Sequence, residues 1–233
     1  LASPTHFSSS VHNAAAAHTS IQLGATGPSL TVSQFEMSVP SALLTASLWL
    51  QEERVDAVLF GGVDETGELL HDCWHRFFPA ATEAQMRPFD FERQSSVPGE
   101  GAAFFILKRR SDGVARYGRI TQILQGNATG AKAPVDEGDV LFLGADGHRE
   151  CSTPYRDHEG TTMAAYASLY GSLPVGPAFD LAIAALSCQA DRICPGPAGA
   201  SRGFDSPEAL AGRPISCLKY GAHGDYGLIR IGK

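Results

Sequence analysis

The chain has 233 residues, of which 43% are hydrophobic and 18% are charged, and its formal net charge is −7. This composition is typical of a globular protein with enough apolar material for a core. The acidic balance argues against a general nucleic-acid-binding protein, because phosphate contacts need clustered lysine and arginine.

In the first half, the residue pattern predicts two helices and several strands. Residues 11–23 are compatible with a helix that the turn residues after Leu23 break, and residues 29–32 fit a short strand. A second helix is expected from Pro40 to about Glu53, because proline is tolerated in the first turn. The apolar run 55–60 predicts a strand buried on both faces, and residues 102–107 and 119–124 predict two more.

The second half repeats this alternation. Residues 140–143 are expected to form a strand, 161–170 and 178–186 helices, and 215–218 with 228–231 a closing antiparallel pair. The stretch 127–138 is rich in glycine, alanine and aspartate and is interpreted as a linker. Strands alternating with helices indicate an α/β protein.

The sequence does not indicate a membrane or secreted protein. No apolar run is long enough to span a bilayer, and the opening residues lack the basic and apolar regions of a signal peptide. The five cysteines are odd in number and fit no disulfide framework, which favours reduced thiols in a cytoplasmic protein.

Four segments resemble the beta-ketoacyl synthase family, in the family's order. They read SPTHFSSSVHNAAAAHTSIQLGATGPSLTV, VDAVLFGGVDE, RPFDFERQSSVPGEGAAFFILKRR and ISCLKYGAHGDYGLIRI. The resemblance implies a thiolase-like five-layered α-β-α-β-α sandwich, here reduced in size and without the usual opening portion. It divides the chain into an N-terminal half at 1–126 and a degenerate C-terminal half at 127–233.

The family nucleophile is a cysteine at the start of a buried helix, where the helix dipole and backbone N–H groups lower the thiol pKa. Counting from Gly27-Pro28-Ser29, that position falls on Glu36, and no cysteine lies within about thirty residues. A carboxylate at that position is stabilised by the positive end of the helix dipole. It cannot, however, form the thioester that carries a growing acyl chain.

Both family histidines are missing as well. Gly144 stands where the first is expected, with His148 four residues on, and Pro177 stands near the second. In the closing turn, His223 fills a position that is normally glycine. The resemblance therefore implies no catalytic residues and a role like that of a chain-length factor, which needs no cofactor.

A chain-length factor pairs with a catalytic ketosynthase subunit and shapes the tunnel for the acyl or polyketide chain. Carrier-protein contacts are then expected mainly through that partner. The resemblance places the dimer strand at Ser29, Leu30, Thr31 and Val32. It places tunnel or interface residues at Phe7, Ser9, Ser10, Val11, His12, Asn13, Ala14 and Phe35.

Alternatives remain open on the sequence. The chain could be a decarboxylase or condensing enzyme of the same fold that uses Glu36 or a displaced cysteine, or a purely structural partner. An ionised Glu36 only accepts hydrogen bonds, so donating one would require a pKa raised by burial. His71 and His75 lie four apart on one helical face, but no third metal ligand is evident and no metal site is expected.

Overall fold

The computed structural model describes residues 3–68, 71–72, 76, 81, 85–109, 115–128 and 132–233. Its helices are α1 (Pro4–Ser10), α2 (Ala14–Leu23), α3 (Ser38–Gln51), α5 (Arg149–Ser152) and α6 (Gly176–Ala190). The longer strands are β1 (Ala57–Asp64), β2 (Gly101–Lys108), β3 (Arg119–Asn127), β4 (Val140–Leu143), β9 (Ile215–Tyr220) and β10 (Asp225–Gly232). Two-residue strands complete the set: β5 (Met163–Ala164), β6 (Arg192–Ile193), β7 (Ser201–Arg202) and β8 (Glu208–Ala209).

The main sheet has six strands in the order β3-β10-β9-β4-β5-β7. β4 runs parallel to both β9 and β5, whereas β10 runs antiparallel to β9 and β3. The closing antiparallel pair expected near the end of the chain is therefore confirmed as β9–β10. Because β3 joins this sheet through β10, the sheet spans the expected linker region, and the division at residue 126 stays a prediction.

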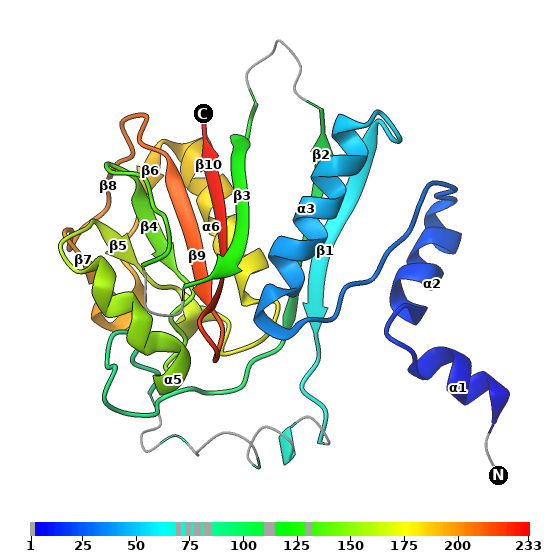
Figure 1. Ribbon diagram of the computed structural model, residues 1–233, viewed down its shortest axis with the longest axis horizontal. Coiled ribbons are helices and arrows are strands. Elements are labelled where there is room, and N and C mark those ends of the chain that lie inside the picture. Colours follow the sequence, from blue (N-terminus) through cyan, green and yellow to red (C-terminus); the bar gives the residue numbers. More distant parts are fainter. Residues whose placement is uncertain are drawn as a thin grey trace.

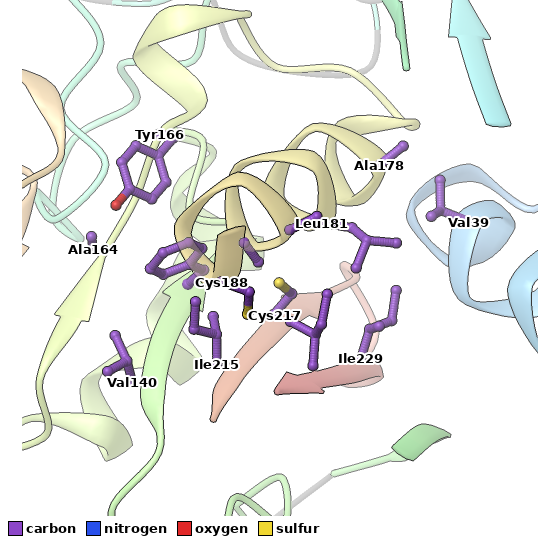
Figure 2. Close-up of a cluster of buried hydrophobic side chains, with 14 of the residues drawn as sticks. Val39, Val140, Ala164, Tyr166, Ala178, Leu181, Cys188, Ile215, Cys217 and Ile229 are labelled. Carbon is purple, nitrogen blue, oxygen red and sulfur yellow. The ribbon is translucent and has the colours of Figure 1, made fainter. Parts of the chain in front are cut away.

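Helices α3 and α6 lie between the six-stranded sheet and a separate two-stranded sheet made of β1 and β2 (Figure 1). One core cluster fills this layer, with Leu181 and Cys188 of α6 facing Cys217 and Ile229 of the sheet (Figure 2). A second cluster lies on the opposite face of the six-stranded sheet and includes Leu141 and Tyr155. This mixed α/β architecture agrees with the expected fold class.

Helix α3 begins at Ser38, which makes Pro40 its third residue. The first four N–H groups of a helix have no partner inside it, so proline costs no hydrogen bond there. The Oγ atom of Ser38 instead accepts a hydrogen bond from the backbone N–H of Gln34 at 2.7 Å. The helix predicted from Pro40 is thus confirmed, with a start two residues earlier.

Residues 3–34 form an arm that carries α1 and α2 beside the body (Figure 1). No residue of α2 is buried, and the predicted helix over 11–23 begins only at Ala14. Residues 29–32 form no strand within the chain. A strand needs a neighbour to accept its hydrogen bonds, so the dimer-strand assignment stays a prediction about pairing with a second chain.

Two other expectations were wrong. The apolar run before Gly61 does form β1, but the strand is not buried on both faces, because α3 and α6 cover only one side of the two-stranded sheet. On its outer side Leu59 pairs with Ile106, and Phe104 lies opposite Gly61, all beside solvent.

The predicted helix over 161–170 is replaced by β5 and a short 3-10 helix, Ala167–Leu169. Met163 and Ala164 pair with Leu141 and Phe142 of β4, so tertiary pairing overrides a local helical tendency. The expected strands over 102–107, 119–124 and 140–143 and the helix over 178–186 are confirmed as β2, β3, β4 and α6.

Candidate functional site

The start of α3 faces the turn that follows β9. Glu36 lies in a short 3-10 helix, Phe35–Met37, that leads directly into α3. A Cβ atom placed on Gly221 would lie 3.9 Å from the Oε2 atom of Glu36, so the carboxylate reaches that turn. Phe35, just before it, has φ of 46°, a left-handed conformation that is costly for an aromatic residue. The surrounding structure must therefore stabilise this backbone conformation of Phe35.

Next to this turn, a buried ion pair joins β9 to the end of β4. The Nζ atom of Lys219 lies 2.9 Å from Oδ2 of Asp146, and it donates a second hydrogen bond of 2.8 Å to the carbonyl oxygen of Gly144. The Oγ atom of Ser172 donates to the same Asp146 oxygen at 2.7 Å. Two donors and two acceptors from three segments of the chain are thus joined in one buried cluster.

Both members of the pair are held in their charged forms. Burial by itself would raise the pKa of Asp146, but the charge and hydrogen bond of Lys219 and the hydroxyl of Ser172 bring that pKa below its usual range. Burial by itself would lower the pKa of Lys219, and the Asp146 carboxylate more than reverses this. Glu36 acts in the same direction on Lys219, since its negative charge also raises that pKa.

The side chain of Lys219 fills the space that a side chain at position 144 would need. A Cβ atom on Gly144 would lie 2.6 Å from Cδ of Lys219 and 3.3 Å from its Cβ. Lys219 is held at both ends, by its strand and by two hydrogen bonds, so its stem has little freedom to move aside. Glycine at 144 and lysine at 219 therefore depend on each other sterically, and an imidazole at 144 does not fit beside this lysine.

His148 is buried in the same cluster, where it serves local structure. Its backbone N–H donates to Oδ1 of Asp146 at 3.2 Å, and its Nδ1 accepts from the backbone N–H of Cys151 at 3.5 Å, at the start of α5. Burial lowers the pKa of the imidazole despite the opposing effect of Asp146, which keeps the ring neutral near pH 7. The shifted histidine of the sequence analysis thus does reach the cluster, as a neutral acceptor.

A second buried carboxyl group lies on the α6 side of the cluster. Asp180 Oδ1 accepts a hydrogen bond of 2.7 Å from the hydroxyl of Tyr170, and its Oδ2 would be 3.5 Å from a Cβ on Gly144. Burial raises the pKa of Asp180 to about 6. This group consequently exchanges its proton in a pH range where Lys219 and Asp146 stay charged.

The thiols of the described residues do not supply an activated nucleophile beside α3. Cys151 is the cysteine whose pKa Glu36, Lys219 and Asp146 all influence, yet burial raises that pKa to about 12. Cys217 is buried with a pKa well above its usual value, and Cys194 is exposed elsewhere. A thiolate is the reactive form, so these surroundings suppress the displaced-cysteine alternative for Cys151.

The structure brings some predicted positions together and leaves others apart. Glu36 and Gly144 both border the cluster, whereas Pro177 lies in the first turn of α6, and the residue of that segment that reaches Asp146 is Ser172. His223 is exposed in the β9–β10 turn, where its carbonyl oxygen accepts from Asn127.

The predicted tunnel residues lie on the arm and at the start of α3. Phe7 and Phe35 are 71% and 76% exposed, so their own chain leaves them largely uncovered, whereas Val11 is exposed to a lesser extent. Ser10 donates a hydrogen bond to the carbonyl oxygen of Phe7, which fixes its hydroxyl to the helix. These side chains are available to a second chain.

Within the described residues, no group of three histidine, cysteine, aspartate or glutamate side chains is placed to hold a metal ion. His71 is exposed, and its expected companion His75 lies outside the described residues. In the same part of the chain, no helix is both long enough and apolar enough to cross a membrane.

The central residues of the cluster were missed by sequence reasoning. Lys219, Asp146 and Asp180 each appear as a single charge inside an apolar or glycine-rich stretch. Buried charges need partners, so a lone lysine in ISCLKY and a lone aspartate in the helix AFDLAIAAL were the signals that could have indicated a buried pair. Sequence alone does not say which charge meets which.

Comparison with known proteins finds similarity to ketosynthases over part of the sequence. Residues 2–113 match the model of the beta-ketoacyl synthase N-terminal domain. A polyunsaturated fatty acid synthase chain of a Thraustochytrium species is 32% identical over 159 residues, which are 62% of this chain and 8% of that protein. The hybrid PKS-NRPS synthetase TAS1 of Gloeophyllum trabeum is 27% identical over 172 residues, 71% of this chain and 11% of that protein.

Solved structures show the same fold at low sequence identity. An oxazolomycin ketosynthase domain from Streptomyces albus matches 96% of this chain and 50% of its own with a TM-score of 0.79 and 16% identity. The ishigamide ketosynthase/chain length factor matches 83% of this chain and 58% of its own with a TM-score of 0.64 and 16% identity. The chain thus spans about half the length of these structures and a small part of the curated relatives.

Proposed function

We propose that this chain acts as a non-catalytic, chain-length-factor-like subunit. Its fold is that of the ketosynthases, and its residues 2–113 match the beta-ketoacyl synthase N-terminal domain. In this role it pairs with a cysteine-bearing ketosynthase and lines part of the tunnel that receives the acyl or polyketide chain. The acyl carrier protein docks mainly on the partner, and the complex is cytoplasmic.

The observation that carries the proposal is the Lys219–Asp146 pair beside Glu36. In ketosynthase chemistry a thiolate attacks an acyl group and imidazoles assist decarboxylation, as the family resemblance implies. Here a carboxylate lies in the 3-10 helix that leads into α3, and a lysine stem fills the space next to Gly144 where an imidazole would stand. A buried lysine that is paired with Asp146 and bonded to the Gly144 carbonyl serves as a structural cation, and its stem leaves no space for an imidazole at this point.

The exposed side chains of the arm support pairing with another chain. The first 51 residues contain one charged side chain, Glu36, if histidine is counted as neutral. Charged residues are depleted at the cores of protein interfaces. Phe7 and Phe35 extend into solvent from this uncharged stretch, as expected of residues that line a shared tunnel.

Co-expression with a cysteine-bearing ketosynthase from the same genomic neighbourhood tests this function. The two chains should co-purify, and mass analysis of the products should show a defined chain length that is lost when this chain is omitted. Supplied alone with malonyl-carrier protein, this chain should release no carbon dioxide and carry no acyl group by intact-mass analysis.

Three outcomes would count against the proposal in different ways. Decarboxylation by the isolated chain, abolished in Glu36→Ala, would favour an enzyme that uses Glu36. An acylated isolated chain would reveal a nucleophile. A ketosynthase that keeps full activity and the same product length without this chain would favour a purely structural partner.

A further inference from the structure

A pocket of about 420 Å³ lies on the opposite side of the six-stranded sheet from α3 and α6. Met163 and Tyr155 line it, and both belong to the core cluster on that opposite face. The volume falls within the range of small-molecule sites, which is about 300–1,000 Å³. The pocket is therefore separate from the cluster around Lys219 and Glu36.

The floor of the pocket is apolar and fixed. Tyr155 and Met163 are almost fully buried. The hydroxyl of Tyr155 accepts a hydrogen bond of 3.0 Å from the N–H of Tyr220 and donates one of 3.4 Å to the carbonyl oxygen of Leu218, which holds the ring against β9. Such a floor is preformed, so a flat apolar ligand would not need to order it.

Two aromatic rings form one wall, and each is covered by an arginine. Phe89 and Phe91 have ring centroids 6.3 Å apart. The guanidinium carbon of Arg202 lies 4.9 Å from the ring centroid of Phe89, and that of Arg156 lies 5.4 Å from the ring centroid of Phe91. The guanidinium groups therefore lie over the rings of the wall, a geometry that suits cation–π contact as well as pairing with an anion.

The two arginines differ in what neutralises them. Arg156 is paired with Glu92. Arg202 donates from Nη1 to the carbonyl oxygens of Ser201 and Gly199, at 2.8 Å and 3.3 Å, and has no carboxylate partner among the residues that the structure describes. Arg202 is exposed, so its guanidinium is hydrated and has N–H groups free to meet an anion that enters the pocket.

Three acids also line the pocket and oppose an anion: Asp90, Glu92 and Glu159. Asp90 is paired with Arg93 and Glu92 with Arg156, which leaves the exposed Glu159 as the main source of repulsion.

We propose that this pocket binds a small aromatic carboxylic acid, with the carboxylate paired to Arg202 and the ring lying on the apolar floor. A planar guanidinium matches a carboxylate by two parallel hydrogen bonds. Phe89 and Phe91, which are only partly buried, supply most of the apolar contact for an aromatic body, because Tyr155 and Met163 are almost fully covered by the protein.

The test uses 2-naphthoate and the neutral isostere 2-naphthalenemethanol, titrated into the complete 233-residue chain by calorimetry. The wild-type chain should bind the acid saturably and at least about tenfold more tightly than the alcohol, as expected for a charge-assisted hydrogen bond. Arg202→Gln should remove that preference without changing the affinity for the alcohol, and Arg202→Lys should restore part of it. Glu159→Gln should strengthen acid binding by a few-fold, because it removes a like charge.

The matched control is Arg54→Gln, just past the end of α3 and therefore in the other layer of the fold, which should leave acid binding unchanged. Circular dichroism melting curves of the Arg202 variants would show that the fold is intact. Equal affinity for acid and alcohol in the wild type, an unchanged preference in Arg202→Gln, or absence of saturation would overturn the proposal. Tighter binding of 2-naphthylmethylammonium than of 2-naphthoate would overturn it in favour of a cation site at Glu159.

Discussion

Lys219 donates a hydrogen bond of 2.8 Å to the carbonyl oxygen of Gly144, while its stem occupies the volume next to the Gly144 Cα atom. Lys219 thus satisfies the carbonyl oxygen of Gly144 and also leaves no space for a side chain at that position.

Gly144→Ala should destabilise the chain by about 1–3 kcal/mol, the usual cost of overpacking a buried site. The added Cβ atom would meet Cδ of Lys219 at 2.6 Å, and the lysine cannot withdraw without losing its hydrogen bonds. Urea denaturation followed by circular dichroism measures this effect. Gly67→Ala is the matched control, since a Cβ atom there meets nothing within 4 Å. A Gly144→Ala chain as stable as wild type would show that Lys219 is mobile.

Lys219→Met should cost about 3–5 kcal/mol, because it leaves the buried Asp146 carboxylate without its cation. Adding Asp146→Asn to Lys219→Met should recover much of that loss. The exposed pair Arg109–Asp56 provides the comparison, where Arg109→Met should change the free energy of unfolding by less than about 1 kcal/mol. Equal costs at the two pairs would contradict the burial argument.

The contribution of the Lys219–Asp146 pair to the free energy of unfolding should also depend on pH. The pKa of Asp146 is lowered in the folded state, so its stabilising effect is present above the ordinary aspartate pKa and is lost as the pH falls through the lowered value. Lys219→Met removes the cause of that lowering. The difference in stability between wild type and Lys219→Met should therefore shrink on acidification below about pH 4, measured by urea denaturation across pH.

Asp180 should show the opposite dependence. Its folded pKa is raised to about 6, so its protonated form favours folding at low pH, and that contribution is lost as the pH rises from the ordinary value of 3.8 to about 6. Asp180→Asn keeps an acceptor for Tyr170 and has no proton to lose. Relative to wild type, the variant should gain on the order of 3 kcal/mol between about pH 3.5 and pH 7.5. If the stability difference between Asp180→Asn and wild type did not change over this pH range, the pKa of Asp180 would not be raised in the folded protein.

The arm offers a test of the chain-length role in the reconstituted complex. Ala14→Phe and Ser10→Phe should shorten the product, because bulk is added to residues proposed to border the tunnel. Ala16 is two positions beyond Ala14 and points about 200° away around α2, so Ala16→Phe is the matched control and should leave product length unchanged. Identical products from all three variants would assign these residues to ordinary packing.

The elements that the sequence predicts well are those with a clear local signal. The apolar runs of β2 and β4 and the broad apolar coverage of α3 and α6 appear in the structure close to their expected bounds. The segment 161–170 is alanine-rich and was expected to be helical, but its backbone partner is β4, about twenty residues away in the chain. No local pattern contains that pairing.

The sequence could suggest which positions align with the family's catalytic residues, but it could not predict the contacts that those positions make. Glu36 and Gly144 could be found by counting along family motifs. That Lys219 fills the space beside Gly144, and that Ser172 rather than Pro177 reaches Asp146, depends on how β4, β9 and the segment before α6 meet in space. Such coupling between distant positions follows from tertiary packing.

The outer side of the β1–β2 sheet shows how the isolated polypeptide will behave during handling. Leu59, Val63, Phe104 and Ile106 present hydrocarbon to water on one ribbon, and in the described part of the chain β1 and β2 pair only with each other. Strand edges with unpaired backbone N–H and C=O groups, flanked by hydrophobic side chains, are templates for the addition of a strand from another chain. Concentrated stocks of the chain alone should therefore self-associate and adsorb to phenyl resins, and Phe104→Lys should reduce both behaviours without touching the interior.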